Sequence, residues 1–427
     1  KPLQDEFVFT VANEKQVVYG SCIHLNLSGI KAKNIPFFAS ANTKSSTYVF
    51  CILSKSPVLS SHFIFLSYLA LASLNLYDIS SIPIIDPPIF DMENIIENLD
   101  LNGQIAHHSS ICVPEYFSNA LKYYYSKKCS SSPFEFGPSA QIFFPPVENL
   151  DCLLWLSLDT LFSVLSVEVI VQLVLAILLD AQVLIIGSSL EEVSMTVLAL
   201  QHIIHPFRFC GPVIPMLPNT SQFFTILMSP TPFIIGVSPC KELSSFVFLD
   251  SCIFISLDKK TESINNGIKY PQEKEVVHKV KQILEKEKSK ISHPFSFPNI
   301  YKQDLNHKYD FSPDATKRIV DTIMSPISIL FSDDIYSYFV TDINESESNP
   351  ITIFNTELFL ASVEPENRLF YENLFESQNF QMFIERKILG METRRNSSSP
   401  LTADITRVPK AEIKRSKSIT KNVLATT

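Results

Sequence analysis

The residues best placed to do chemistry follow a short apolar run near the middle of the chain. There Ser188 and Ser189 come after Gly187, between a predicted strand and a predicted helix. A serine in such a turn acts as a nucleophile in the motif G-x-S-x-G, whose second glycine permits the sharp turn that exposes the hydroxyl. Glu191 occupies that glycine position here. The sequence therefore disfavours a serine hydrolase, and a helix start capped by a serine explains the turn better.

Other catalytic arrangements have less support. The chain has no G-x-x-x-x-G-K-[ST] loop, and the paired glutamates in the first turn of the helix would repel a phosphate. His107 and His108 with Cys112 are metal-ligand types, but they lack a second ligand pair at zinc spacing. His202 and His205 end a predicted helix, where a hydrogen-bonded or exposed histidine is usual. We expect no catalytic residue, no metal site and no cofactor.

Composition narrows the class of protein. The chain has 427 residues, of which 46% are hydrophobic and 19% charged, so it can bury sizeable cores in two or three domains. Its net charge of −9 disfavours a nucleic-acid partner, which needs clustered Lys and Arg. The eight cysteines lie scattered without C-x-x-C spacing, which is typical of buried thiols in a reducing compartment.

One apolar stretch, Ser56–Tyr77, is long enough to span a bilayer and contains no Asp, Glu, Lys or Arg. Serines, an asparagine and a histidine dilute it, so we interpret it as the core helix of a soluble domain. We recognise no targeting peptide, although the sequence opens on Lys1 rather than Met.

The elements that would position these residues fall into two lobes. In the first, Phe7–Leu25 is a predicted hairpin that turns at Asn13–Gln16. A third strand is predicted over Thr47–Leu53 and a helix over Ser61–Leu76. Strands followed by a helix indicate a small α+β lobe.

The second lobe alternates strands and helices. A strand at Val183–Ile186 leads into the helix capped by Ser188 or Ser189, whose apolar positions recur at helical spacing. Short apolar runs follow at Pro212–Pro218 and Phe233–Val237, and two more precede Asp258. The alternation predicts an α/β layer around a largely buried sheet. The predicted buried face of the helix consists of Val193, Val197, Leu200 and Ile204.

The run at Phe233 belongs to the motif MSPTPFIIGVSP, Met228–Pro239. Pro230 and Pro232 each fix their own φ and push the preceding residue into an extended conformation. Gly236 stands where a side chain would not fit, so the motif indicates a rigid, buried strand rather than a ligand site. We expect Gly236→Val to impair folding first.

Taken in order, these motifs resemble the DENN domain. Phe7–Leu25 with Tyr48–Pro57 resembles its upstream region, and Val363–Ile388 resembles its downstream region. Its central region is resembled by Leu178–Ser194, His205–Pro218 and Ser229–Pro239. The resemblance implies a fold of α/β with α+β parts: an N-terminal longin-like lobe, with an antiparallel sheet and helices, and a three-layer α/β lobe. It also implies a guanine-nucleotide exchange factor that grips a Rab-type small GTPase between the lobes in vesicle trafficking. The positions that carry the fold are Gly20, Gly187, Pro230, Pro232 and Gly236.

Exchange needs binding surface rather than a nucleophile. Candidate GTPase-contacting residues are Asp180, Gln182, Ser188, Ser189 and Leu190, because open α/β sheets commonly present binding groups at the ends of their strands. Asp180 matches the acidic position of the family's central motif. A hydrogen bond made locally at the end of a helix is the simpler interpretation of that aspartate.

Two other activities stay open. Some relatives with longin lobes are GTPase-activating proteins that use an arginine finger. Because no arginine precedes Arg208, a finger from the first lobe is not available here. A scaffold or effector that binds a Rab without promoting exchange would differ by only a few interface residues.

The predicted segments are 1–125 for the longin-like lobe, 126–139 for a linker, 140–258 for the α/β lobe, 259–300 for a charged helical insert, 301–390 for the downstream helices and 391–427 for a disordered basic tail. We expect the apolar stripe of the charged insert to pack on the lobe, and the alternative is that the insert is a partner-binding helix. The stripe consists of Val276, Val277, Val280, Ile283 and Leu284.

The tail suggests how the protein is placed in the cell. Its sequence KRSKS suits an anionic membrane surface, and phosphorylation of Ser416 or Ser418 would weaken that attraction. We expect a cytoplasmic protein that is recruited peripherally to membranes.

Overall fold

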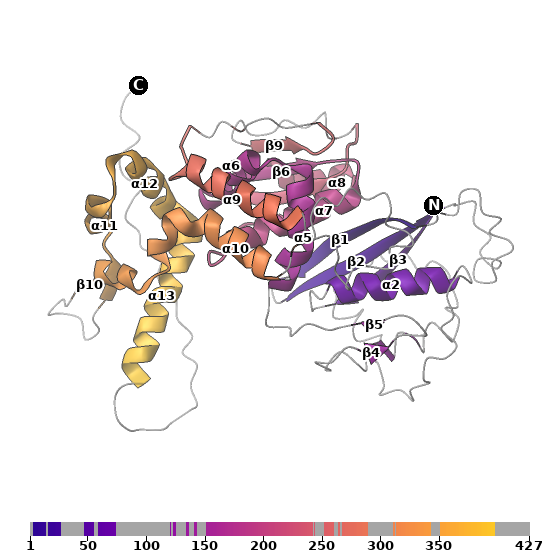
Figure 1. Cartoon of the computed structure of the whole chain (residues 1–427), viewed down its shortest axis with the longest axis horizontal. Coiled ribbons are helices and arrows are strands. Elements are labelled where there is room, and N and C mark those ends of the chain that lie inside the picture. The colour runs from indigo at the N-terminus through magenta and orange to yellow at the C-terminus, as the bar shows by residue number, and fades with distance from the viewer. Residues whose placement is uncertain are drawn as a thin grey trace. The chain divides into compact units, whose positions relative to one another are not determined.

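The computed structural model (Figure 1) divides into two units, residues 1–385 and 386–427. It describes residues 3–13, 16–26, 47–54, 59–73, 120, 123–124, 134–135, 141–142, 151–241, 243, 252–259, 264, 267–288, 311, 313–342 and 351–397. All elements from β1 to α12 lie in the first unit, and the boundary falls within the last helix, α13 (Gln378–Ser397).

The N-terminal part is an antiparallel sheet of three strands in the order β1-β2-β3. Its strands are β1 (Leu3–Asn13), β2 (Gln16–Asn26) and β3 (Thr47–Ser54). The first two form the predicted hairpin, which closes with Asn13 opposite Gln16. A further short pair, β4 (Phe134–Glu135) and β5 (Gln141–Ile142), is also antiparallel.

Helix α2 (Leu59–Ser73) packs on β2 and β3 and confirms the helix predicted from the apolar stretch (Figure 1). It is buried around most of its circumference, with Phe63 and Phe65 both at 0% exposure. Its His62 Nδ1 lies 2.8 Å from the Tyr124 hydroxyl, and Phe65 stacks on the Tyr124 ring. The predicted positions 74–76 lie outside the described residues.

The second sheet is parallel and has four strands in the order β7-β8-β6-β9. These are β6 (Gln182–Ile186), β7 (Val213–Ile214), β8 (Phe233–Val237) and β9 (Cys252–Ser256). The predicted alternation of strands and helices is therefore confirmed here. The run at residues 246–250 lies outside the described residues, and only two residues of the Pro212–Pro218 run form a strand.

Helix α7 (Leu190–Ile203) connects the two sheets. It packs against β6 and β8, and its other side contacts β1. The buried Ser194 hydroxyl accepts a hydrogen bond from the Val8 N–H at 3.2 Å, and Thr10 donates to the Val213 carbonyl at 3.4 Å. The predicted buried face is confirmed, but burial extends around nearly the whole helix because α5 and strands of both sheets pack against it.

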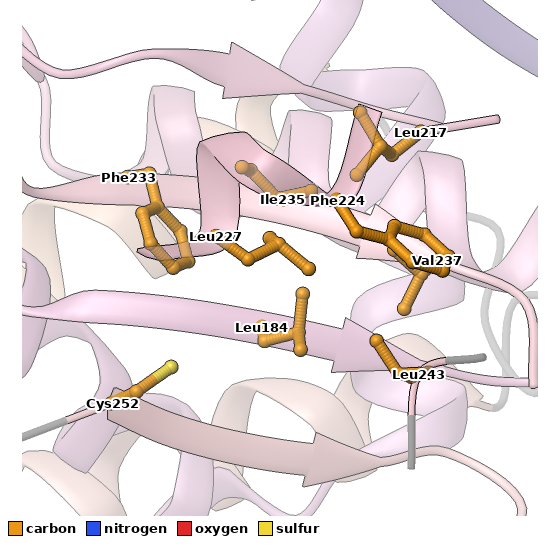
Figure 2. Packing of buried hydrophobic residues seen from close by; sticks show 9 residues of the cluster. All are labelled: Leu184, Leu217, Phe224, Leu227, Phe233, Ile235, Val237, Leu243 and Cys252. Atoms are coloured by element: carbon orange, nitrogen blue, oxygen red, sulfur yellow. The ribbon is translucent and has the colours of Figure 1, made fainter. Parts of the chain in front are cut away.

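The other face of the parallel sheet is covered by α8 (Ser221–Phe224) and the 3₁₀ helix η2 (Thr225–Met228). Figure 2 shows how Phe224 and Leu227 from these turns lie over the strand residues Leu184 and Ile235. Each apolar side chain of this size contributes about 1.5–3 kcal/mol when it is fully buried. The cluster thus holds the strands and their covering turn together. Its members are Leu184, Leu217, Phe224, Leu227, Phe233, Ile235, Val237, Leu243 and Cys252.

Helices α5 (Asp151–Val164), α6 (Val167–Leu178), α9 (Glu273–Lys288) and α10 (Pro313–Met324) complete this part. The predicted stripe of α9 packs against α6 and α10, with Val276, Val280 and Leu284 buried. Lys281 pairs with Glu168 of α6, and Arg318 of α10 pairs with the buried Glu287 at 2.9 Å. The insert helix is thus part of the core.

The downstream elements surround an aromatic cluster in which Phe354, Phe359, Phe375 and Phe380 contact one another edge to face or tilted. The elements are η4 (Ser325–Leu330), η5 (Asp333–Tyr338), β10 (Phe339–Asp342), β11 (Ile351–Phe354), α11 (Thr356–Ser362), η6 (Pro365–Asn367), α12 (Arg368–Glu376) and the start of α13.

Candidate functional site

The predicted site residues lie at the two ends of strand β6. Asp180 and Gln182 are at its amino end, whereas Ser188–Leu190 follow its carboxyl end. A strand of five residues is roughly 17 Å long, so the candidates form two separate groups. They do not make one contact site.

Asp180 ends helix α6 in the left-handed region, with φ of 58°. Its N–H donates to the Ile177 carbonyl at 3.2 Å, and the Ala181 N–H donates to the Ala176 carbonyl at 2.9 Å. This pair of hydrogen bonds is a Schellman cap, in which glycine is the usual left-handed residue. An aspartate here indicates that its side chain has a role of its own.

The Asp180 carboxylate accepts hydrogen bonds from the N–H groups of Gln378 and Asn379 at the start of α13. Burial raises the pKa of Asp180, although these two hydrogen bonds act in the opposite direction. The expected local hydrogen bond was the wrong interpretation, because the partner is 198 residues away in the sequence. Asp180 holds the downstream helix against the end of α6.

Sequence reasoning missed Asn379, which is fully buried. Its Nδ2 donates to the Ile177 carbonyl at 2.8 Å, and its Oδ1 accepts from the Cys210 N–H at 2.9 Å. The side chain therefore bonds to α6 and to the segment after α7 at once. An asparagine within the apolar run NFQMF was the available signal, since a buried amide needs partners.

Gln182 fastens the MSPTP segment to the parallel sheet. Its Nε2 donates to the Ser229 carbonyl at 2.6 Å and to the Thr231 carbonyl at 3.0 Å, and the residue is 5% exposed. These carbonyls belong to the residues that precede Pro230 and Pro232. The alternating prolines hold the segment extended, so that both carbonyls meet one amide.

At the carboxyl end, the turn after β6 is bound by Asp258. The Ser188 N–H donates to both carboxylate oxygens at 3.1 Å, and the Ser188 hydroxyl donates to Oδ1 at 2.5 Å. Both residues are exposed. Asp258 was not singled out from the sequence, although it directly follows a predicted strand, where parallel strands end side by side.

Ser189 is the residue that caps α7, because its hydroxyl accepts from the Glu192 N–H at 3.2 Å. Leu190 follows as a half-buried side chain in the first turn. The capped helix start predicted from the sequence is confirmed. Because the Ser188 hydroxyl bonds to a carboxylate rather than a histidine, this turn is not arranged as an activated nucleophile.

Close approach of backbone explains two of the fold positions. A Cβ on Gly236 would lie 2.3 Å from the Pro215 carbonyl oxygen and 2.5 Å from Val193 Cγ1. A Cβ on Gly20 would lie 2.3 Å from the Phe9 ring. Gly187 is less tightly enclosed, with its nearest neighbour 3.0 Å from the added atom.

The described residues contain no group of three or more His, Cys, Asp or Glu side chains that could hold a metal ion. Within the same residues, no single helix is long and apolar enough to cross a membrane. The pair Ser157–Val164 and Val167–Leu178 has the combined length and composition, but it bends by 117°.

Three large apolar side chains that sequence reasoning did not single out are exposed near the cluster of Figure 2. Phe223 is 47% exposed, Met228 49% and Phe254 43%. Phe254 pairs with Leu184, so it lies on the cluster's face of the sheet. Exposed aromatic and Met side chains are common anchors in protein interfaces.

A model of the DENN (AEX-3) domain matches residues 45–260, from just before β3 to just after β9. The match covers half of the sequence and the whole parallel sheet, and the chain belongs to the DENN domain family. Members of this family are typically guanine-nucleotide exchange factors for Rab GTPases. The upstream and downstream resemblances outside residues 45–260 stay predictions.

Similarity to individual proteins agrees with this family assignment. The chain is 24% identical to human DENN domain-containing protein 2C over 237 residues, which is 54% of this chain and 23% of that protein. It is 26% identical to human DENN domain-containing protein 2B over 242 residues, 54% of this chain and 19% of that protein. It is 37% identical to mouse DENN domain-containing protein 2A over 79 residues, 18% and 8% of the two chains. The chain thus spans less than a quarter of the length of these relatives.

Proposed function

We propose that this protein is a guanine-nucleotide exchange factor for a Rab-type small GTPase. The observation that carries the proposal is the DENN match over residues 45–260, which contains the parallel sheet and the helix α7 that joins it to the N-terminal sheet. The three antiparallel strands with α2 would be the longin-like lobe, and the parallel sheet between its helices the three-layer lobe.

Exchange requires only differential binding. A protein that binds the nucleotide-free GTPase more tightly than the GDP-bound form weakens GDP binding by the same factor. An interface of about 1,200–2,000 Å² would be a normal size for such a complex. Two hydrogen bonds link these two parts: the Val8 N–H donates to Ser194, and Thr10 donates to the Val213 carbonyl. They support a contact surface whose two halves stay fixed relative to each other.

The carboxyl end of β6 is the part of the candidate site that we assign to GTPase contact. Ser188 and its partner Asp258 are exposed, and Ser189 and Leu190 are partly exposed. Asp180 and Gln182 are engaged in contacts within the protein, so we assign them a structural role.

A charge at Leu190 tests this assignment. Leu190→Asp keeps the helix start favourable, because acidic residues suit the first turn, and it places a charge in the proposed contact. Leu358→Asp is the matched control, since Leu358 also lies in the first turn of a helix, α11, and is 47% exposed. We expect exchange to fall about ten-fold for Leu190→Asp, equivalent to roughly 1.4 kcal/mol, and to stay unchanged for the control. Equal activity of both variants would place the contact elsewhere.

The activity itself is tested by the release of fluorescent GDP from a panel of Rab GTPases. We expect faster release from at least one member. Binding that prefers the GTP form without faster release would instead make the protein an effector or scaffold. Faster GTP hydrolysis would make it a GTPase-activating protein.

For its place in the cell we propose a cytoplasmic protein held on membranes through the basic segment 391–427. Eight Lys and Arg residues there, among them those of KRSKS, support attraction to anionic lipid. Co-sedimentation with vesicles that contain phosphatidylserine, with and without residues 391–427, tests this. Equal vesicle binding of the full chain and the truncated chain at low salt would contradict membrane attachment through this segment. Unchanged vesicle binding after phosphorylation of Ser416 or Ser418 would contradict the proposed weakening by phosphorylation.

A further inference from the structure

Two cysteines of the N-terminal sheet face each other across strands β2 and β3. Cys22 is the direct antiparallel partner of Cys51, so both side chains lie on the same face of the sheet. Directly opposed residues have Cα atoms about 4.5–5.5 Å apart, within the range of about 4.4–6.8 Å that a disulfide spans. Both are thiols, and their side chains are hydrogen-bonded to each other.

The two thiols differ in access and in acidity. Cys51 lies on the edge strand and is exposed, whereas Cys22 lies on the central strand, opposite Phe7, and is 2% exposed. The hydrogen bond from Cys22 lowers the pKa of Cys51, and the same contact raises that of Cys22. An oxidant arriving from solvent therefore meets the more acidic thiol first, and the thiolate is the reactive form.

We propose that Cys22 and Cys51 are a peroxide-reactive pair that closes to an intramolecular disulfide. The Cys51 thiolate attacks one oxygen of hydrogen peroxide, the O–O bond breaks, and the departing hydroxide takes up a proton as water. The Cys22 sulfur then attacks the Cys51 sulfenic sulfur, the S–O bond breaks, and the Cys22 proton leaves with the hydroxyl as a second water. Two thiols lose two electrons and two protons, and one peroxide becomes two waters.

The disulfide would fasten the edge strand to its neighbour. In the described sheet β3 pairs with β2 alone. A covalent link at Cys51 would limit local opening of β3, so its amide protons would exchange more slowly in the oxidised protein.

The test uses the whole 427-residue chain, reduced, freed of reductant and treated with hydrogen peroxide in the presence of dimedone. Remaining thiols are then alkylated and the protein is digested for mass spectrometry. We expect a peptide pair linked through Cys22 and Cys51, lighter by about 2 Da than the two reduced peptides, with little dimedone on Cys51. Cys22→Ser removes the resolving thiol, so dimedone on Cys51 should rise about ten-fold.

Cys240 is a half-buried cysteine in the segment after β8. The variant Cys240→Ser is the matched control and should leave the linked peptide unchanged. Stable dimedone labelling of Cys51 in the unmodified protein, without a linked peptide, would overturn the proposal. Oxidation of other cysteines while Cys22 and Cys51 both stay reduced would also overturn it. Both of these contradicting results are measured on the unmodified protein, so the test remains valid even if a variant folds poorly.

Discussion

At Gly236 of β8 an added Cβ would collide with both the Pro215 carbonyl and the side chain of Val193 on α7. Substitution by valine adds a branched side chain at that contact, so the chain must shift or the strand must leave the sheet. We expect Gly236→Val to lower the free energy of unfolding by about 2–3 kcal/mol, as overpacking typically does. Urea unfolding followed by circular dichroism measures it.

Gly390→Ala provides the comparison, because a Cβ at Gly390 meets nothing within 4 Å and alanine favours a helix. Should Gly236→Val keep wild-type stability yet lose GDP exchange, the MSPTPFIIGVSP motif would be a contact site and our interpretation of it as a buried strand would be wrong.

Asp180 combines a left-handed backbone with a partly buried carboxylate. Asp180→Asn keeps a residue that tolerates φ of 58° and an oxygen that accepts from Gln378, whereas Asp180→Ala loses both. We expect the alanine variant to be less stable than the asparagine variant by about 1–2 kcal/mol in urea unfolding. Equal stability of the two variants would show that the side-chain oxygen of residue 180 does not hold α13.

The same residue gives a pH dependence with a defined sign. Because burial raises the Asp180 pKa above its ordinary value of 3.8, the folded state binds more protons than the unfolded state just above that pH. Asp180 therefore contributes most to stability at low pH, and the contribution falls as pH rises through the folded pKa. The unfolding free energy of wild type should therefore fall relative to that of Asp180→Asn as pH rises through the folded pKa. Parallel curves for the two proteins would contradict the raised pKa of Asp180.

His202, in the last turn of α7, predicts acid sensitivity. Burial, and secondarily the neighbouring His205, lower the pKa of His202 from 6.5 to about 4. Its Nε2 is enclosed without a hydrogen-bond partner among the described residues. The unfolded chain thus binds the extra proton, and stability falls as pH drops from about 6.5 towards 4, by about 2 kcal/mol between pH 7 and pH 5. His202→Gln should flatten the unfolding free energy over that range, and an unchanged slope would count against it.

At the scale of elements, helix α9 separates two interpretations of the charged insert. Val280 is fully buried against the neighbouring helices, whereas Lys279 beside it is 53% exposed. Val280→Asp buries an unpaired charge and should cost about 3 kcal/mol or more of unfolding free energy. Lys279→Asp on the same helix should change it by less than about 1 kcal/mol, since an exposed ion pair contributes little. A stable Val280→Asp protein would mean that α9 is a detachable partner-binding helix.

Local patterns predicted the elements well. Two extended runs around a polar turn identified the β1–β2 hairpin. The strand, glycine turn and capped helix over residues 183–204 followed from the apolar pattern and from the serine cap. Helix α2 was placed within a few residues because its apolar run ends near polar residues. These features depend on neighbours in the sequence.

The contacts that position the candidate site were not predictable in this way. Asp180 meets Gln378, and Ser188 meets Asp258 70 residues later. Gln182 binds carbonyls of a segment 47 and 49 residues away. A hydrogen bond between distant segments leaves no periodic trace in one sequence, so Asp180 and Gln182 were interpreted as candidate contact residues when their partners lie within the fold.

At the scale of the whole molecule, the proposed function would depend on how the chain binds two states of its GTPase partner. No covalent step is required, and the surface at the carboxyl end of β6 would be one part of a larger contact. The preference of the chain for the nucleotide-free GTPase and the loss of GDP affinity would then be equal in free energy, because both measure the same coupling.

The decisive measurement is the rate of fluorescent GDP release from Rab GTPases as the concentration of the purified 427-residue chain is raised, with excess unlabelled GDP present. We predict that for at least one Rab the rate rises with concentration to a plateau at least about ten-fold above the intrinsic rate, a coupling of roughly 1.4 kcal/mol or more. If the rates of all Rabs stay at their intrinsic values while the chain still binds the GTP-bound form of one of them, the protein is not an exchange factor for that GTPase family.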